Sequence, residues 1–262
     1  QAAPLTSTDA LPVASSSFRA AAFSVPVAST HSGMPAASSV GPPSTGAPAA
    51  AIEAAHRVLD ADGMGYWESP ALKARIAAHY SEAYGISVDP ERVLLTCGAS
   101  PAFVLALSCL FSPGARVALA RPGYVAYRNT LKALHLEPIE LVCGEAERFQ
   151  ITADAVERLE PAPDGVIVAS PANPTGTIIP PEELRALADV CKRRGIALVS
   201  DEIYHGLSYT QPAESMLQHA PDALVVNSFS KYFSMAGWRL GWLIVPDSLI
   251  DAARARMGNL FL

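Results

Sequence analysis

The chain has only four cysteines among its 262 residues, and no two of them form a C-x-x-C pair: Cys97, Cys109, Cys143 and Cys191. Its six histidines form no cluster with the spacing of metal ligands. Zinc sites need such grouped ligands, so the sequence argues against zinc and we expect no metal. Scattered free cysteines are typical of a reducing compartment, which indicates a cytoplasmic protein.

Clustered positive charge and long apolar runs are also missing. The chain has 19 Lys and Arg against 25 Asp and Glu, for a formal net charge of −6, and its basic residues form no stripe. Nucleic acids and anionic membrane surfaces are bound through clustered basic residues, so we expect neither as a partner. No apolar run reaches the ~20 residues that span a bilayer, so we expect no membrane segment.

Charge is nearly absent from the first 45 residues, which are rich in Ala, Ser, Pro and Thr. The apolar stretch 19–28 is short, is broken by Pro26 and lacks a basic leader, which argues against a secretion signal. We therefore expect residues 1–45 to be a poorly ordered segment, and residues 46–262 to form the folded domain.

From about residue 50, helical and extended patterns alternate along the chain. Three stretches have helical spacing: 48–60, 70–84 and 181–194. Five short and nearly continuous apolar runs predict strands that are buried on both faces: 92–96, 116–120, 165–169, 196–200 and 223–227. This alternation predicts an α/β fold with a mostly parallel sheet, in which a ligand lies beyond the carboxyl ends of the strands.

Residues suited to binding follow the first three predicted strands. Gly98, Ala99 and Ser100 begin a helix, where free backbone N–H groups could hold an anion, although an ordinary helix cap explains them as well. Tyr124 could cover a flat ligand or simply pack on the edge of the sheet. Asn173 precedes a proline in a stiff loop, which favours an amide that reaches a ligand over a turn-forming role.

Charged residues follow the last two predicted strands. Asp201 ends an apolar run, where an unpaired carboxylate is costly, so it needs a cationic ligand or an internal salt bridge. The neighbouring Glu202 fits a solvated position, and Tyr204 can turn back toward the site of Asp201. Lys231 lies among hydroxyls and aromatic rings in SFSKYFSMAGWRLGW, and desolvation makes a lysine amine nucleophilic.

Ser228, Ser230 and Arg239 supply hydroxyls and a guanidinium that suit a phosphate group. One ligand would use all five strand ends, namely pyridoxal 5′-phosphate (PLP). Its aldehyde needs a lysine, its pyridine nitrogen an acid and its ring oxygen a donor, while its ring needs an aromatic partner and its phosphate an arginine with N–H groups.

The motifs SPANPTG, DEIY and SFSKYFSMAGWRLG, in this order, resemble those of the class I and II (fold-type I) PLP-dependent aminotransferases, from about residue 40 to the last residue. The resemblance implies a homodimer whose three-layer αβα large domain, here 46–262, has a mostly parallel sheet of roughly seven strands. In the family a small domain follows, whose arginine binds the substrate carboxylate, and we expect that domain to be absent from this chain.

The resemblance also assigns roles to the matching residues. Lys231 is similar to the lysine that forms a Schiff base with PLP and moves the proton, and Asp201 to the partner of the pyridine nitrogen. Asn173 and Tyr204 resemble the pair that binds the ring oxygen, and Tyr124 the residue that stacks on the ring.

Six residues resemble the phosphate-binding set of the family: Gly98, Ala99, Ser100, Ser228, Ser230 and Arg239. Tyr66 is similar to a tyrosine that contacts the phosphate of the partner subunit, and Gly41 to an element on the substrate side.

The implied reaction is the transfer of an amino group between an amino acid and a 2-oxo acid. Two alternatives stay open. Other PLP enzymes, such as C–S lyases and decarboxylases, share the cofactor motifs, and a remnant could bind PLP without turnover. The sensor half of a transcription regulator is disfavoured, because no basic or helix-turn-helix segment precedes residue 50.

Overall fold

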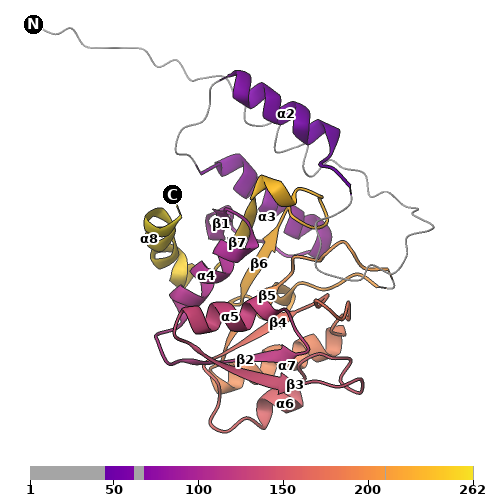
Figure 1. Cartoon of the computed structure of the whole chain (residues 1–262), viewed down its shortest axis with the longest axis vertical. Helices are drawn as coiled ribbons and strands as arrows, with labels where there is room; N and C mark the ends of the chain where they lie inside the picture. Colours follow the sequence, from indigo (N-terminus) through magenta and orange to yellow (C-terminus); the bar gives the residue numbers. More distant parts are fainter. Residues whose placement is uncertain (1–44, 62–67, 210, 262) are drawn as a thin grey trace, which may run out of the picture.

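The computed structural model describes residues 45–61, 68–209 and 211–261. A single seven-stranded sheet organises them (Figure 1). Its strands are β1 (Val93–Thr96), β2 (Arg116–Arg121), β3 (Glu137–Val142), β4 (Gly165–Ala169), β5 (Ala197–Asp201), β6 (Leu224–Ser228) and β7 (Gly241–Ile244). The order across the sheet is β1-β7-β6-β5-β4-β2-β3. The only antiparallel pairings in this sheet are those of β7 with β1 and β6, which confirms the mostly parallel sheet.

The apolar runs predicted five of these strands to within one residue at each end. They missed β3 and β7 for different reasons. β3 lies at the edge of the sheet and carries Glu137 and Glu140, so it lacks the continuous apolar run of a central strand. β7 is fully buried but has only four residues and begins with a glycine, so its pattern is too short to identify.

Seven α-helices occur in the described residues: α2 (Ala49–Asp60), α3 (Pro70–Tyr84), α4 (Ala99–Leu110), α5 (Val125–Ala133), α6 (Ala153–Glu157), α7 (Pro181–Arg194) and α8 (Ile250–Leu260). The predicted helices 70–84 and 181–194 are confirmed at both ends. Each is ended by a left-handed glycine, Gly85 at φ 69° and Gly195 at φ 66°. Within the described part of the chain, every helix is too short or too polar to cross a lipid bilayer.

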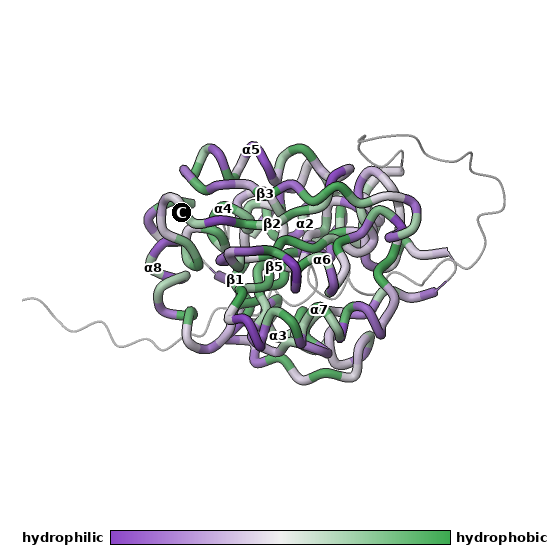
Figure 2. Tube along the Cα trace, turned by 90° about the horizontal axis from the view of Figure 1, so that it is seen from below, coloured by the Kyte–Doolittle hydropathy of each residue, from purple (hydrophilic) through white to green (hydrophobic). Residues whose placement is uncertain are grey.

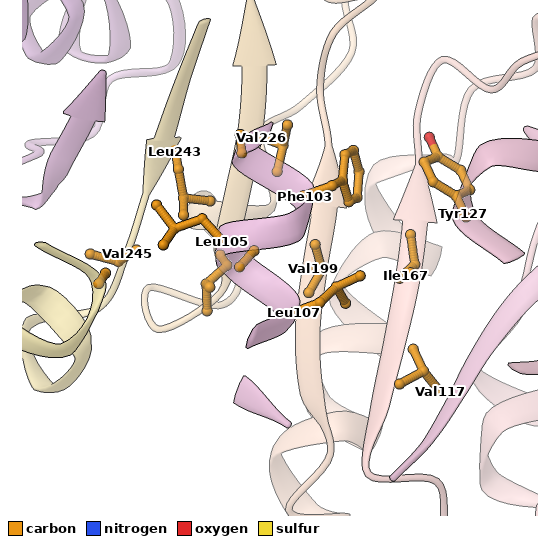
Figure 3. Packing of buried hydrophobic residues seen from close by; sticks show 14 of the residues in the cluster. Phe103, Leu105, Leu107, Val117, Tyr127, Ile167, Val199, Val226, Leu243 and Val245 are labelled. Atoms are coloured by element: carbon orange, nitrogen blue, oxygen red, sulfur yellow. The ribbon is translucent and has the colours of Figure 1, made fainter. Parts of the chain in front are cut away.

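The helices cover both faces of the sheet. On one face, α4, α5 and α8 pack against side chains such as Ile167 and Val226, as Figure 3 shows for α4. On the other face, α6 and α7 pack against Val166 and Val168, and α3 packs against Trp242. Neighbouring residues of β4 thus face opposite layers, as strand geometry requires. Figure 2 shows α4 and α5 on one side of the sheet and α3 and α7 on the other, which confirms the three-layer αβα fold.

The expected poorly ordered segment, residues 1–45, lies outside the described residues except for residue 45. That expectation stays untested. So does the division of the chain at residue 46.

Candidate functional site

The sheet brings the predicted site residues to one edge. Parallel strands place their carboxyl ends on the same edge, where β1, β2, β4, β5 and β6 end. β7 runs in the opposite direction and therefore begins there. Gly241, its first residue, pairs with Thr96 of β1 on one side and with Ser228 of β6 on the other. The turn before α4 and the segment between β6 and β7 consequently lie against each other.

An anion cradle forms where these two segments meet. We use this name for the first turn of α4 together with Ser228, Ser230 and Arg239. The N–H groups of the first turn of a helix have no partner within the helix and attract anions. Arg239 lies against the turn before α4, since its Nη2 donates to the carbonyl oxygen of Cys97 at 3.3 Å. Ser228 and Ser230 are buried beside each other, and the Ser230 N–H donates to Ser228 Oγ at 3.1 Å.

Gly98 is required by the shape of this cradle. Its φ of 98° is strained for any residue with a side chain, and an added Cβ would lie 2.5 Å from Nη2 of Arg239. The missing side chain therefore leaves the guanidinium room to reach the start of α4.

Gly241 is tightly enclosed by backbone, and replacing it should loosen the cradle. A Cβ at this position would lie 2.8 Å from the carbonyl carbon of Gly98, 2.9 Å from the oxygen of Asn227 and 3.1 Å from the nitrogen of Ala99. Since backbone atoms cannot rotate away, we expect Gly241→Ala to lower the free energy of unfolding by about 1–3 kcal/mol. Urea denaturation would measure this.

Gly237→Ala is the matched control, because nothing lies within 4 Å of a Cβ added there. We expect it to unfold at the wild-type urea concentration. Equal stability of the Gly241 and Gly237 variants would contradict the close approach of β7 to the start of α4.

Asp201 is a buried acid at the end of β5, with 5% of its surface exposed. Oδ2 accepts a hydrogen bond from the hydroxyl of Tyr127 at 2.5 Å, and Oδ1 accepts one from the N–H of Ile203 at 3.1 Å. Burial raises the pKa of the Asp201 carboxyl to about 6, although these hydrogen bonds and the charge of Lys231 act in the other direction. The site thus holds a carboxyl that a nearby cation would help to ionise.

Within residues 45–61, 68–209 and 211–261, the internal salt bridge that we set against a ligand role for Asp201 is not formed. None of the ion pairs among the described residues includes this carboxylate. The need for a cationic partner therefore stands.

Lys231, Tyr204 and Asn173 meet beside Asp201. Lys231 is half-buried, and its Nζ lies 5.8 Å from the centre of the Tyr204 ring. The hydroxyl of Tyr204 accepts a hydrogen bond from Nδ2 of Asn173 at 3.3 Å. Burial raises the pKa of Tyr204, so its hydroxyl keeps a proton that it can donate to a ligand.

Tyr124 lies at the start of α5, edge-on to Tyr127 with 5.4 Å between ring centres. Together with Asn173 these two rings line a small cavity of about 20 Å³. A larger cavity of about 410 Å³ lies elsewhere, between the end of β3 and α6, and none of the predicted site residues lines it. The chemistry of the side chains, rather than the size of the cavity, therefore points to the strand ends.

Two residues of the predicted site, Gly41 and Tyr66, lie outside the described residues. The structure places the other eleven at the same edge of the sheet, around the anion cradle and Asp201. Their proposed contacts with a ligand stay predictions.

The expectation that Glu202 is solvated is wrong. Its surface is only 1% exposed. Glu202 directly follows β5 and continues its hydrogen bonding to β6, because its N–H donates to the carbonyl oxygen of Val226 at 2.9 Å. Successive side chains of a strand point to opposite faces, so the side chain of Glu202 points away from the face that Asp201 occupies. Its Oε1 accepts hydrogen bonds from Ser215 Oγ at 3.0 Å and from the N–H of Met216 at 2.9 Å.

Tyr127, which holds Asp201, was also missed by the sequence analysis. The signal was present, because Tyr127 follows Tyr124 by three residues at the start of a helix, where such residues share a face. Burial raises the pKa of Tyr127, so its hydroxyl stays a donor to Asp201.

Known proteins are similar to this chain in sequence and fold. Residues 39–262 match the family model described as aminotransferase class I and II. The valine–pyruvate aminotransferase of Mycobacterium tuberculosis is 48% identical over 84% of this chain and 58% of its own length. A solved aminotransferase structure from the same organism has a TM-score of 0.82 and 47% identity, over 84% of this chain and 58% of that chain. Aspartate aminotransferase of Thermus thermophilus with maleate has a TM-score of 0.79 and 32% identity, over 84% and 59%. The chain thus spans little more than half the length of the curated relatives it matches.

Proposed function

The chain belongs to the class I and II aminotransferases, and from this premise we propose that it transfers an amino group between an amino acid and a 2-oxo acid. The family depends on PLP. We assign residues 46–262 to the cofactor-binding large domain. The alternatives, a lyase or decarboxylase reaction or binding without turnover, find no support among the similar proteins described above, which are aminotransferases by name.

The side chains at the strand ends fit PLP on two observations. The first is the anion cradle, where the lack of a side chain at Gly98 lets the Arg239 guanidinium approach the start of α4, since an added Cβ would lie 2.5 Å from its Nη2. The second is Asp201, a buried acid without an ion-pair partner among the described residues. A phosphate and a protonated ring nitrogen are the groups that these two features would receive.

Each residue of the site would have a separate task. The cradle would hold the phosphate with charge-assisted hydrogen bonds. Asp201, kept in place by Tyr127, would hold the proton on the ring nitrogen. Asn173 and Tyr204 would donate to the ring oxygen, and Tyr124 would lie against the ring. The bound cofactor supplies an electron sink that makes the α-proton of the amino acid acidic.

Lys231 is the group that moves protons in this proposal. Its Nζ would take the proton from Cα of the amino acid, as a general base. The aromatic ring of Tyr204 lies beside it, with 5.8 Å between Nζ and the ring centre. The observation that carries the proposal is this combination of a lysine, a buried acid and an anion cradle on one edge of the sheet.

The proposal is tested by incubating the purified protein with PLP, valine and pyruvate, a pair suggested by the name of the M. tuberculosis relative. We expect alanine and the 2-oxo acid of valine to form in equal amounts, and other amino acids to be tested in the same way. Ammonia released with pyruvate from a sulfur amino acid would instead indicate a lyase. PLP binding without any product would leave only a binding remnant.

We further propose that the protein acts as a cytoplasmic homodimer. All four cysteines are free, which suits a reducing compartment. The apolar side chains of Ile52 and Leu59 are exposed on α2, a surface that a partner subunit would cover. The role of Tyr66 across the subunit boundary remains part of this proposal.

A further inference from the structure

A cluster of polar side chains is buried behind the proposed cofactor site, and the mechanism above does not use it. We call it the His205 cluster, and it comprises Tyr84, Ser170, Glu202, His205 and Ser215. His205 is 8% exposed, and Ser170, Glu202 and Ser215 are buried even more deeply. Buried polar groups are costly unless they are paired, so their arrangement calls for an explanation.

The hydrogen bonds of His205 fix the proton on its ring. Nε2 lies 2.9 Å from the carbonyl oxygen of Ser170, and a carbonyl only accepts, so Nε2 carries the proton and donates it. Nδ1 lies 2.7 Å from the hydroxyl of Tyr84. Burial lowers the pKa of His205 to about 4, so the ring is neutral and Nδ1 accepts from Tyr84. Both nitrogens are therefore engaged, and the ring is held in one orientation.

The two bonds of His205 join segments that carry site residues. Ser170 begins the loop with Asn173, and its Oγ accepts from the N–H of Ile179 at 3.0 Å, which closes that loop. His205 itself directly follows Tyr204. The hydrogen bond between Asn173 and Tyr204 thus spans the same two segments that His205 connects from behind.

Glu202 lies beside Nδ1 of His205. Its Oε1 accepts from Ser200, Ser215 and Met216, while its Oε2 has no hydrogen-bond partner among the described residues and lies 3.7 Å from Nδ1 of His205. Burial raises the pKa of Glu202 to about 8, so the neutral acid adds no charge behind Asp201. Asp201 acts electrostatically on Glu202, Glu202 acts on Tyr80 and Tyr84, and His79 acts on His205.

We propose that His205 is a positioning residue, which fixes the loop of Asn173 against the turn of Tyr204 so that both side chains are aligned on the ring oxygen of the cofactor. This inference rests on the proposed function for the identity of that ligand. The two hydrogen bonds of His205 do not depend on the cofactor. Their role can therefore be tested with and without PLP.

The first test measures amide hydrogen exchange in residues 170–179 without cofactor. His205→Leu removes both hydrogen bonds, and we expect exchange in this loop to rise on the order of tenfold. His205→Gln keeps an amide N–H that can reach the Ser170 carbonyl, so its loop should exchange at nearly the wild-type rate. Wild-type exchange in the leucine variant, or equal loosening in both variants, would overturn the inference.

The second test adds PLP and follows its visible absorption band as a function of pH. Under the proposed function, Asn173 and Tyr204 would donate to the ring oxygen of PLP and so influence the pH at which its band changes. The leucine variant should therefore move the midpoint of this titration by about one pH unit. The glutamine variant should restore it. An unmoved midpoint in the leucine variant would also overturn the inference.

Should His205→Leu fail to fold, Tyr84→Phe removes only the hydroxyl that bonds Nδ1 and leaves the packing in place. We expect it to raise exchange in the loop about threefold. Unchanged exchange would count against the inference. A wild-type protein that binds no PLP would refute the proposed function, whereas the exchange measurements would still decide the role of His205.

Discussion

Replacing Lys231 by alanine is expected to abolish the covalent attachment of PLP and to lower transamination by a factor on the order of 10³ or more. The amine of Lys231 is the only lysine amine that the described residues place near Asp201, Tyr204 and the anion cradle. No other residue of the described site offers a nitrogen that can both bond to an aldehyde and take a proton. Borohydride reduction followed by peptide mass spectrometry would find PLP on Lys231 in the wild type.

Two further variants sharpen this result. Lys231→Arg keeps the positive charge but cannot release its proton, so it should be as inactive as the alanine variant. Lys192→Ala removes an exposed lysine of α7 and should leave activity unchanged. Activity that survives in Lys231→Arg would show that the lysine supplies only charge. PLP trapped on another lysine of the wild type would show that the site is misassigned.

Replacing Asp201 by asparagine should weaken PLP binding and slow turnover, each by a factor on the order of 10². The amide has the same shape, and its oxygen can still accept the hydrogen bond from Tyr127, but its NH2 group then cannot accept from the N–H of Ile203. It carries no charge, however, and so cannot keep a proton on the ring nitrogen. PLP affinity and the rate of product formation, measured side by side, would test this.

The same substitution should stabilise the protein without cofactor above pH 6. Burial raises the pKa of Asp201 from 3.8 to about 6, so the folded wild type holds a proton that the unfolded chain releases earlier. The stability that this proton confers is complete below about pH 3.8 and is lost as the pH rises to about 6. Asparagine does not titrate and escapes this loss, which amounts to at most about 3 kcal/mol. The hydrogen bond from Ile203 that asparagine gives up offsets part of this gain.

Thermal unfolding of the two proteins between pH 4 and pH 8 would reveal the difference. Asp189→Asn, an exposed change on α7, serves as the control and should follow the wild type at every pH. A wild type that is as stable as Asp201→Asn at pH 8 would mean that the carboxylate already has a compensating partner. Loss of activity together with a gain in stability would mark Asp201 as a residue kept for function.

The positions of Lys231 and Asp201 were predictable because each follows an apolar run, and the carboxyl ends of parallel strands share one edge. Buried contacts between distant segments were not predictable. Tyr127 and Asp201 are 74 residues apart, and Tyr84 and His205 are 121 apart. The burial of Glu202 likewise depends on η2 (Met216–Gln218), whose amide and preceding serine approach its carboxyl only in the folded protein.

The direction of β7 has a consequence for how the protein is made. Thr96 of β1 pairs with Gly241, and more than half of the chain separates these residues. At the usual speed of synthesis, β1 waits without its partner β7 for a time on the order of ten seconds on the ribosome. Its sequence, Val-Leu-Leu-Thr, is the kind of apolar edge that other nascent chains can join. Arg239 can contact the turn before α4 only once β7 has paired with β1. We therefore expect the proposed anion cradle to assemble only after β7 has been synthesised.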